Sequence, residues 1–117
     1  MNTFRFLDFQ VYSQAKKYYK NVLILSFRIK DYSFKDQIKR AALSIVLNIA
    51  EGSAKKSDKE FAKFLEISIA SANEVAACID IIYSLKRISN NEYEVLMKEL
   101  EDIIKQLGGF IKKLRDS

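Results

Sequence analysis

Apolar residues recur at three- and four-residue steps along most of this 117-residue chain, which is the spacing of one face of an α-helix. The last quarter shows the pattern as a single stripe: Tyr93, Leu96, Leu100, Ile103, Leu107, Phe110 and Leu114. Similar stripes run through the first quarter and through residues 61–88, and a nearly continuous apolar run fills residues 41–50. Short polar breaks near residues 31–33, 52–57 and 89–91 separate these segments. The pattern predicts four helices, near residues 7–30, 34–53, 58–88 and 91–115.

Each polar break ends in a pattern typical of a helix N-terminus, a Ser followed three residues later by an acidic residue. The three pairs are Ser33 and Asp36, Ser57 and Glu60, and Ser89 and Glu92. In such a capping box the Ser oxygen accepts a hydrogen bond from a free backbone N–H, and the acid accepts one from the Ser backbone. The pairs therefore predict where the second, third and fourth helices begin.

The connections between these helices are short, so neighbouring helices should run antiparallel. Pro is absent and Gly numbers only 3, which disfavours the turn-rich β sandwiches and barrels. Gly108-Gly109 interrupts the fourth helix and is a candidate kink. The sequence predicts an all-α, antiparallel up-down four-helix bundle that occupies residues 1–117 as a single domain.

Two of the predicted helices carry more apolar surface than a lone bundle of this size can bury. Residues 41–50 contain only Ser44 and Asn48 as polar residues, and the third helix has two apolar stripes and a zone of small residues. One interpretation is a well-buried central helix. The other, which we favour, is a second apolar face that binds copies of the same chain.

Four polar residues within these apolar helices are candidate site residues: Asn48, Glu51, Ser71 and Glu74. Asn48 and Glu51 share a face of the second helix, and Ser71 and Glu74 share a face of the third. The two pairs are not level across the predicted hairpin, so direct contact within one chain is not expected. Glu51 and Glu74 could act as acid and base in an enzyme, but no other feature indicates a substrate cleft. We interpret the four as polar residues that set helix register or subunit contacts.

Several kinds of chemistry are excluded or disfavoured by composition. His is absent and Cys78 is the only cysteine, so His-based catalysis, an internal disulfide and a zinc site are not expected. No metal, cofactor, small-molecule substrate or enzymatic activity is predicted. No apolar run approaches the ~20 residues of a membrane-spanning helix, and no signal peptide is recognisable. We expect a cytoplasmic protein without a membrane partner.

The formal net charge of +5 comes entirely from the first half of the chain. Residues 1–56 carry 11 basic and 4 acidic side chains. The candidate phosphate-binding residues are Lys16, Lys17, Lys20, Lys35, Lys39, Arg40, Lys55 and Lys56. Tyr12, Tyr18 and Tyr19 alternate with the first lysines and could stack on bases. The alternative is a solvated lysine-rich face beside ordinary core tyrosines.

The stretch QIKRAALSIVLNIAEGSAKKSDKEFAKFLEISIASANEV, residues 37–75, resembles a known signature. It is similar to the four-helix-bundle proteins encoded by intervening sequences in bacterial 23S ribosomal RNA genes, also called the S23 ribosomal protein family. The family pattern runs roughly Q-I-R-R-A-A-x-S-I-P-x-N-I-A-E-G, then K-E-F-x-x-F-L, then a small residue with Ser and Glu. The matching residues are Arg40, Ala41, Ala42, Ser44, Ile45, Asn48, Ile49, Ala50, Glu51, Gly52, Lys59, Glu60, Phe61, Phe64, Leu65, Ser71 and Glu74. Val46 stands where the family usually has Pro, which should straighten the second helix.

The resemblance implies a bundle that assembles as a ring-shaped homo-oligomer, a pentamer, without enzymatic activity. It also implies nucleic-acid binding, because a relative in diversity-generating retroelements binds nucleic acid as an accessory to reverse transcriptase. The leading hypothesis is therefore a non-catalytic oligomer that binds RNA or DNA through the basic face of the first two helices. The alternative is a protein-interaction scaffold or accessory subunit whose basic face meets an acidic protein.

Overall fold

The computed structural model describes residues 3–116, and over that range it is all-α with no strand. A short 3₁₀ turn, η1 (Arg5–Asp8), precedes four helices: α1 (Gln10–Ser26), α2 (Tyr32–Ser53), α3 (Asp58–Ser84) and α4 (Asn90–Arg115). The molecule is elongated, with principal extents of 45 × 22 × 20 Å. Residues 1, 2 and 117 of the expected domain lie outside the described part.

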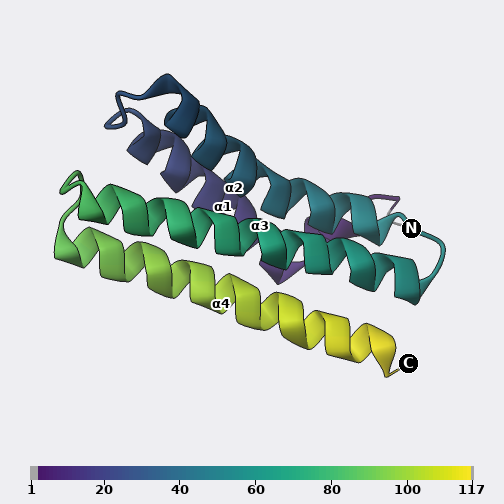
Figure 1. The fold of residues 1–117 in the computed structure, drawn as a ribbon. Coiled ribbons are helices and arrows are strands. Elements are labelled where there is room, and N and C mark those ends of the chain that lie inside the picture. The colour runs from purple at the N-terminus through teal and green to yellow at the C-terminus, as the bar shows by residue number, and fades with distance from the viewer. Residues whose placement is uncertain (1–2, 117) are drawn as a thin grey trace.

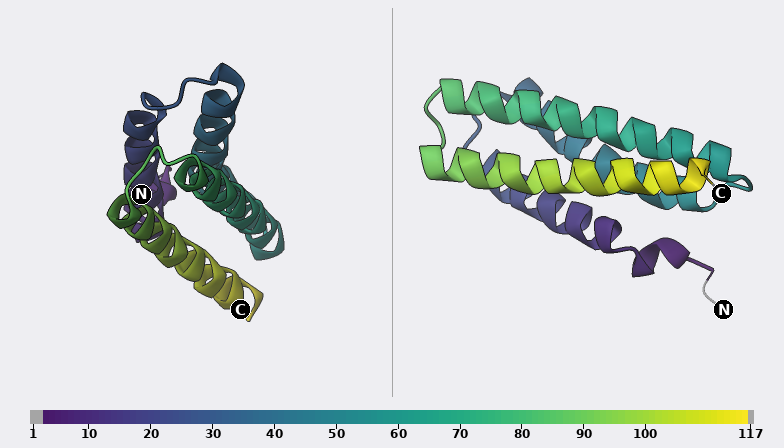
Figure 2. Two further views of the ribbon diagram at one scale, coloured as in Figure 1. Left: turned by 60° about the vertical axis from the view of Figure 1, so that its left-hand side comes forward. Right: turned by 90° about the horizontal axis from the view of Figure 1, so that it is seen from below.

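The helices alternate in direction, and successive helices pack side by side. The α1–α2 and α3–α4 turns lie at one end of the bundle, and the α2–α3 turn and both termini lie at the other (Figure 1). The helices follow one another around the bundle in chain order, so that α4 returns beside α1 (Figure 2). The predicted four-helix, antiparallel arrangement is confirmed.

Helix starts follow the sequence signals at two of three places. Ser89 forms a complete capping box with Glu92, with hydrogen bonds of 3.0 Å and 2.9 Å. Ser57 caps α3 by accepting from the Glu60 N–H at 3.2 Å. For α2 the predicted cap, Ser33, is wrong. Asp31 is the N-cap and accepts a hydrogen bond from the Phe34 N–H at 3.0 Å. An Asp carboxylate caps a helix as well as a Ser hydroxyl does, so α2 begins two residues earlier than predicted.

The predicted limits of the first and third helices are too wide. Residues 5–8 form a separate 3₁₀ turn and Phe9 is extended, so α1 begins at Gln10 and ends at Ser26 rather than spanning 7–30. In α3 the helix ends at Ser84 rather than 88, and Lys86 adopts a φ of 61° in the turn that follows. The two C-terminal errors have one cause: Ile29 and Ile88 are buried but lie in the turns after the helices, so the apolar spacing continues past the helix ends.

The core is a continuous apolar cluster to which all four helices contribute side chains. Ser68 of α3 lies inside it and donates its hydroxyl to the Ile45 carbonyl of α2 at 2.9 Å, which satisfies a buried polar group. Gly52, near the end of α2, packs against the side chains of Phe61 and Phe64 of α3. Helix α4 runs through Gly108 and Gly109 without interruption.

Candidate functional site

Two lysines of α1 and two of α2 lie on neighbouring antiparallel helices, and we call Lys16, Lys20, Lys35 and Lys39 the basic face. Each helix contributes residues four apart, which share one side of a helix. Lys16 and Lys20 are exposed, and Lys35 and Lys39 are half-buried. None of the four takes part in an ion pair within residues 3–116. Their charges are therefore available to an external anion.

The register of α1 against α2 brings the two halves of the basic face together. At one end Arg5 Nε donates to the Ser53 carbonyl at 3.0 Å, and at the other the turn at residues 27–31 joins the helices. Between these points the antiparallel helices place Lys20 within about one helical turn of Lys39 along the bundle axis. The Lys16 ammonium lies 5.2 Å from the ring centre of Tyr12, four residues earlier in α1.

The other four candidate cations lie elsewhere. Lys17 points toward α4, where it lines a cavity with Glu99 and Asp102. Arg40 is held by Asp36 at 2.7 Å, as an i, i+4 pair. At the far end of the bundle, the Lys55 ammonium lies 4.8 Å from the Phe64 ring centre, and Lys56 is exposed in the α2–α3 turn. The eight predicted cations thus do not form one surface.

Tyr18 is not available for stacking on a base and is a core tyrosine, as the alternative interpretation expected. It is buried in the core, and its hydroxyl donates to the Leu96 carbonyl of α4 at 3.1 Å. Burial, with a smaller contribution from Glu99, raises the pKa of Tyr18 well above its usual value. Tyr18 therefore ties α1 to α4.

The predicted polar residues on α2 and α3 are connected through Ser44. The Asn48 side-chain amide donates to the Ser44 carbonyl at 2.9 Å and to its hydroxyl at 3.0 Å. The Ser44 and Ser71 hydroxyls are hydrogen-bonded at 2.7 Å across the α2–α3 seam. Ser44 was not among the predicted site residues, although its position four before Asn48 in an apolar run could have identified it.

The two glutamates of the candidate acid–base pair lie far apart in this chain. Gln37 donates to Glu74, whereas Glu51 lies beside Gly52, which packs at the level of Phe64. Glu74 is ten residues further along α3 than Phe64, which corresponds to roughly 15 Å. The two carboxyl groups therefore do not face one another across a common site. No group of His, Cys, Asp and Glu suited to a metal ion occurs within residues 3–116.

The α2–α3 seam also carries exposed apolar side chains. Leu47 is 52% exposed and Ile67 is 47% exposed. The Ser44–Ser71 and Gly52–Phe64 contacts place these two residues at nearly the same level on the outer side of the bundle. Leu47 is the one exposed large apolar side chain of residues 41–50, whereas Ile45, Val46 and Ile49 are buried, so most of the apolar run of α2 packs into the core.

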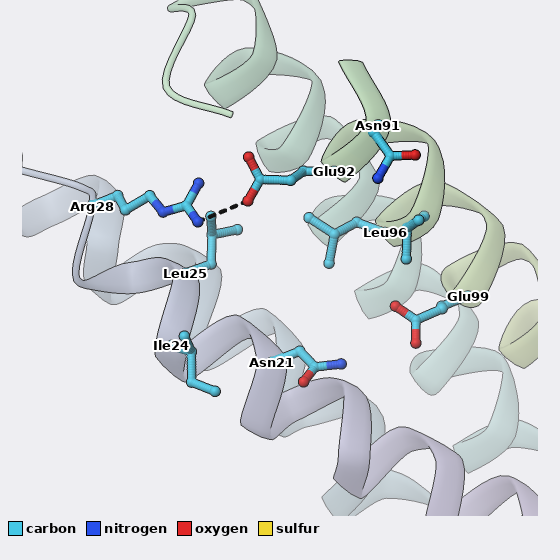
Figure 3. A pocket seen from close by; sticks show the side chains of 9 residues that line it. Asn21, Ile24, Leu25, Arg28, Asn91, Glu92, Leu96 and Glu99 are labelled. Atoms are coloured by element: carbon cyan, nitrogen blue, oxygen red, sulfur yellow. Dashed lines mark ion pairs between the residues drawn. The ribbon is translucent and has the colours of Figure 1, made fainter. Parts of the chain in front are cut away.

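A cavity of about 290 Å³ lies between α1 and the start of α4 (Figure 3). Arg28, in the turn after α1, reaches across it to the carboxylate of Glu92 at 2.7 Å. The hydrogen bond from Arg28, and then the one from the Ser89 N–H, lower the pKa of Glu92 to about 2. Apolar side chains such as Ile24 and Val95 line much of the remaining wall of the cavity. Because the charges at its Arg28 end neutralise each other, the cavity is less suited to an anion than the basic face.

Comparisons with known proteins agree with the fold. The family model described as 23S rRNA-intervening sequence protein matches residues 7–109. A solved structure from Bacteroides thetaiotaomicron VPI-5482, described as a protein of unknown function from the S23 ribosomal protein family, is similar with a TM-score of 0.83. It is 24% identical, over 87% of this chain and 98% of that chain. No curated protein matches. Within residues 3–116, none of the helices has the length and apolar character needed to cross a membrane.

Proposed function

This chain belongs to the family of 23S rRNA-intervening sequence proteins, and we propose that it is a non-catalytic, self-associating helical bundle that binds RNA or DNA through the basic face. The observation that carries the proposal is the basic face itself: four lysines on two adjacent helices, none of which takes part in an ion pair with another residue of the described range 3–116. Clustered, unneutralised lysines of this kind bind phosphates by releasing condensed counterions.

Self-association supports this function because it repeats the basic face. Leu47 and Ile67 are exposed on α2 and α3, within about one helical turn of the Ser44–Ser71 hydrogen bond, and offer an apolar contact there. The basic face lies on the α1–α2 side, so both surfaces can be used at the same time. Several weak phosphate contacts in one assembly then reinforce one another through effective concentration.

The test is a mobility-shift titration at several salt concentrations. In one variant all four lysines of the basic face are changed to Gln, and in the control Lys59, Lys63, Lys112 and Lys113 are changed to Gln. Both variants lose the same charge. We expect only the first to lose most of its affinity, and the slope of log affinity against log salt to fall by about 3, since each phosphate contact contributes roughly 0.7–0.9.

Three results would contradict the proposal: no binding at low salt, binding that is insensitive to salt, or equal losses in the two variants. A pull-down with and without nuclease distinguishes nucleic-acid binding from the alternative function, a scaffold that binds an acidic protein. A partner protein that stays bound after nuclease treatment, and is lost in the basic-face variant, would identify a scaffold for an acidic protein instead.

A further inference from the structure

Two aromatic rings on the α1–α2 turn are the most exposed large apolar side chains within residues 3–116. Phe27 is 85% exposed and Tyr32 is 78% exposed. A single exposed ring on a protein surface needs no special explanation. Two rings at opposite ends of one short turn, beside the basic face, are a more specific arrangement.

Helical spacing aligns each ring with the lysines of its own helix. Phe27 has helical backbone angles, φ −65° and ψ −18°, so the α1 periodicity continues through it. It lies seven residues after Lys20, which is about two turns on the same side of the helix. Tyr32 is the first residue of α2 and lies seven residues before Lys39. The two lysine rows therefore each end in an exposed ring, and the rings flank one turn.

The turn that carries the rings is held in place. The N–H groups of Phe27, Arg28 and Ile29 donate to carbonyls of the last turn of α1, and the Ile29 side chain is buried. Asp31 caps α2 immediately before Tyr32, and Arg28 is bound to Glu92 of α4. A ring on such a turn loses little conformational freedom when a ligand stacks on it.

Flat rings beside unpaired cations match the chemistry of single-stranded nucleic acid. The lysines contact phosphates, and the rings offer surfaces on which unpaired bases stack. A duplex keeps its bases stacked inside, so it can use the lysines but not the rings. We propose that Phe27 and Tyr32 are base-stacking residues, and that the ligand of the basic face is single-stranded RNA or DNA. This inference rests on the proposed function and specifies its ligand.

The test separates stacking from phosphate contact by using a ligand without bases. Affinities are measured for an oligothymidylate of about 12 nucleotides, a length within known site sizes, and for an abasic oligomer of the same length. The wild type should prefer the base-bearing oligomer by at least about fivefold for each ring that stacks. The double variant Phe27→Leu, Tyr32→Leu should bind both oligomers equally, with its affinity for the abasic oligomer unchanged.

Matched variants make the outcomes distinguishable. Phe4→Leu removes an exposed ring from the other end of the bundle and should leave the preference for bases intact. The four-lysine variant of the basic face should weaken binding to both oligomers, and if it does not, the proposed function fails. If the lysines matter but the wild type binds both oligomers equally, only the stacking inference fails. A smaller assembly of the double variant in light scattering would assign the rings to contacts between copies, and would also overturn it.

Discussion

Replacing Gly52 with Ala tests how closely α2 approaches α3. A Cβ added at Gly52 would lie 2.7 Å from the Phe64 Cβ and 3.0 Å from Cδ1 of Phe61. The Phe64 Cβ is attached directly to the α3 backbone, so no side-chain rotation can move it away. Phe61 is buried and packs edge-on against Phe110, with ring centres 5.1 Å apart, so it has little room to move. The helices must therefore separate locally.

The expected cost follows from two opposing effects. Overpacking of this kind costs about 1–3 kcal/mol. Replacing a helical Gly with Ala stabilises the helix by about 0.5–1 kcal/mol. The net result for Gly52→Ala is a loss of about 0.5–2 kcal/mol in the free energy of unfolding, because the steric effect is the larger.

Gly108→Ala is the matched control, because a Cβ at Gly108 would have no neighbour within 4 Å. Only the helix effect remains there, so this variant should be more stable than the wild type by about 0.5–1 kcal/mol. Both are measured by urea unfolding followed by circular dichroism, at one fixed protein concentration because self-association shifts apparent stability. If Gly52→Ala were as stable as Gly108→Ala, the close approach of α2 and α3 described above would be wrong.

Three further predictions concern an ion pair, a buried hydroxyl and the apolar surface. Because Glu92 has a lowered pKa in the folded chain, its ion pair with Arg28 stabilises above the ordinary pKa of 4.5 and is lost as pH falls toward about 2. Glu92→Gln, which keeps a side chain suited to the capping box, should therefore lower the urea midpoint at pH 7 and have a much smaller effect near pH 2, where Glu92 is about half protonated in the folded chain. Tyr18→Phe should leave the tyrosinate absorbance of the folded protein at pH 10.5 unchanged, because the raised pKa keeps Tyr18 protonated there; a decrease would show that Tyr18 ionises normally. Leu47→Lys, at an exposed position, should reduce the assembly mass in light scattering while the helical circular dichroism stays the same; an unchanged mass would exclude this surface as the contact.

The periodicity of the sequence was sufficient to predict four helices and their antiparallel order. A helix that buries one face shows that face in its spacing, and Ser57 and Ser89 cap helices through contacts with residues only three positions away. Helical spacing and capping both depend on residues close together in the chain, so they can be recognised from the sequence before the fold is known. The motif around Asn48, Glu51 and Gly52 likewise marked the family, which the match over residues 7–109 confirms.

Helix ends and surface groupings were decided by tertiary structure. Ile29 and Ile88 continue the apolar spacing but are buried by turns, and spacing cannot tell which kind of backbone buries a side chain. Similarly, eight basic residues were expected to act together, yet Lys17 lines a cavity with acidic residues of α4, Arg40 is bound to Asp36, and residues 55–56 lie in the α2–α3 turn. The direction of a side chain relative to a neighbouring helix depends on packing between residues far apart in the chain. For the same reason, only the fold showed that Tyr18 is enclosed.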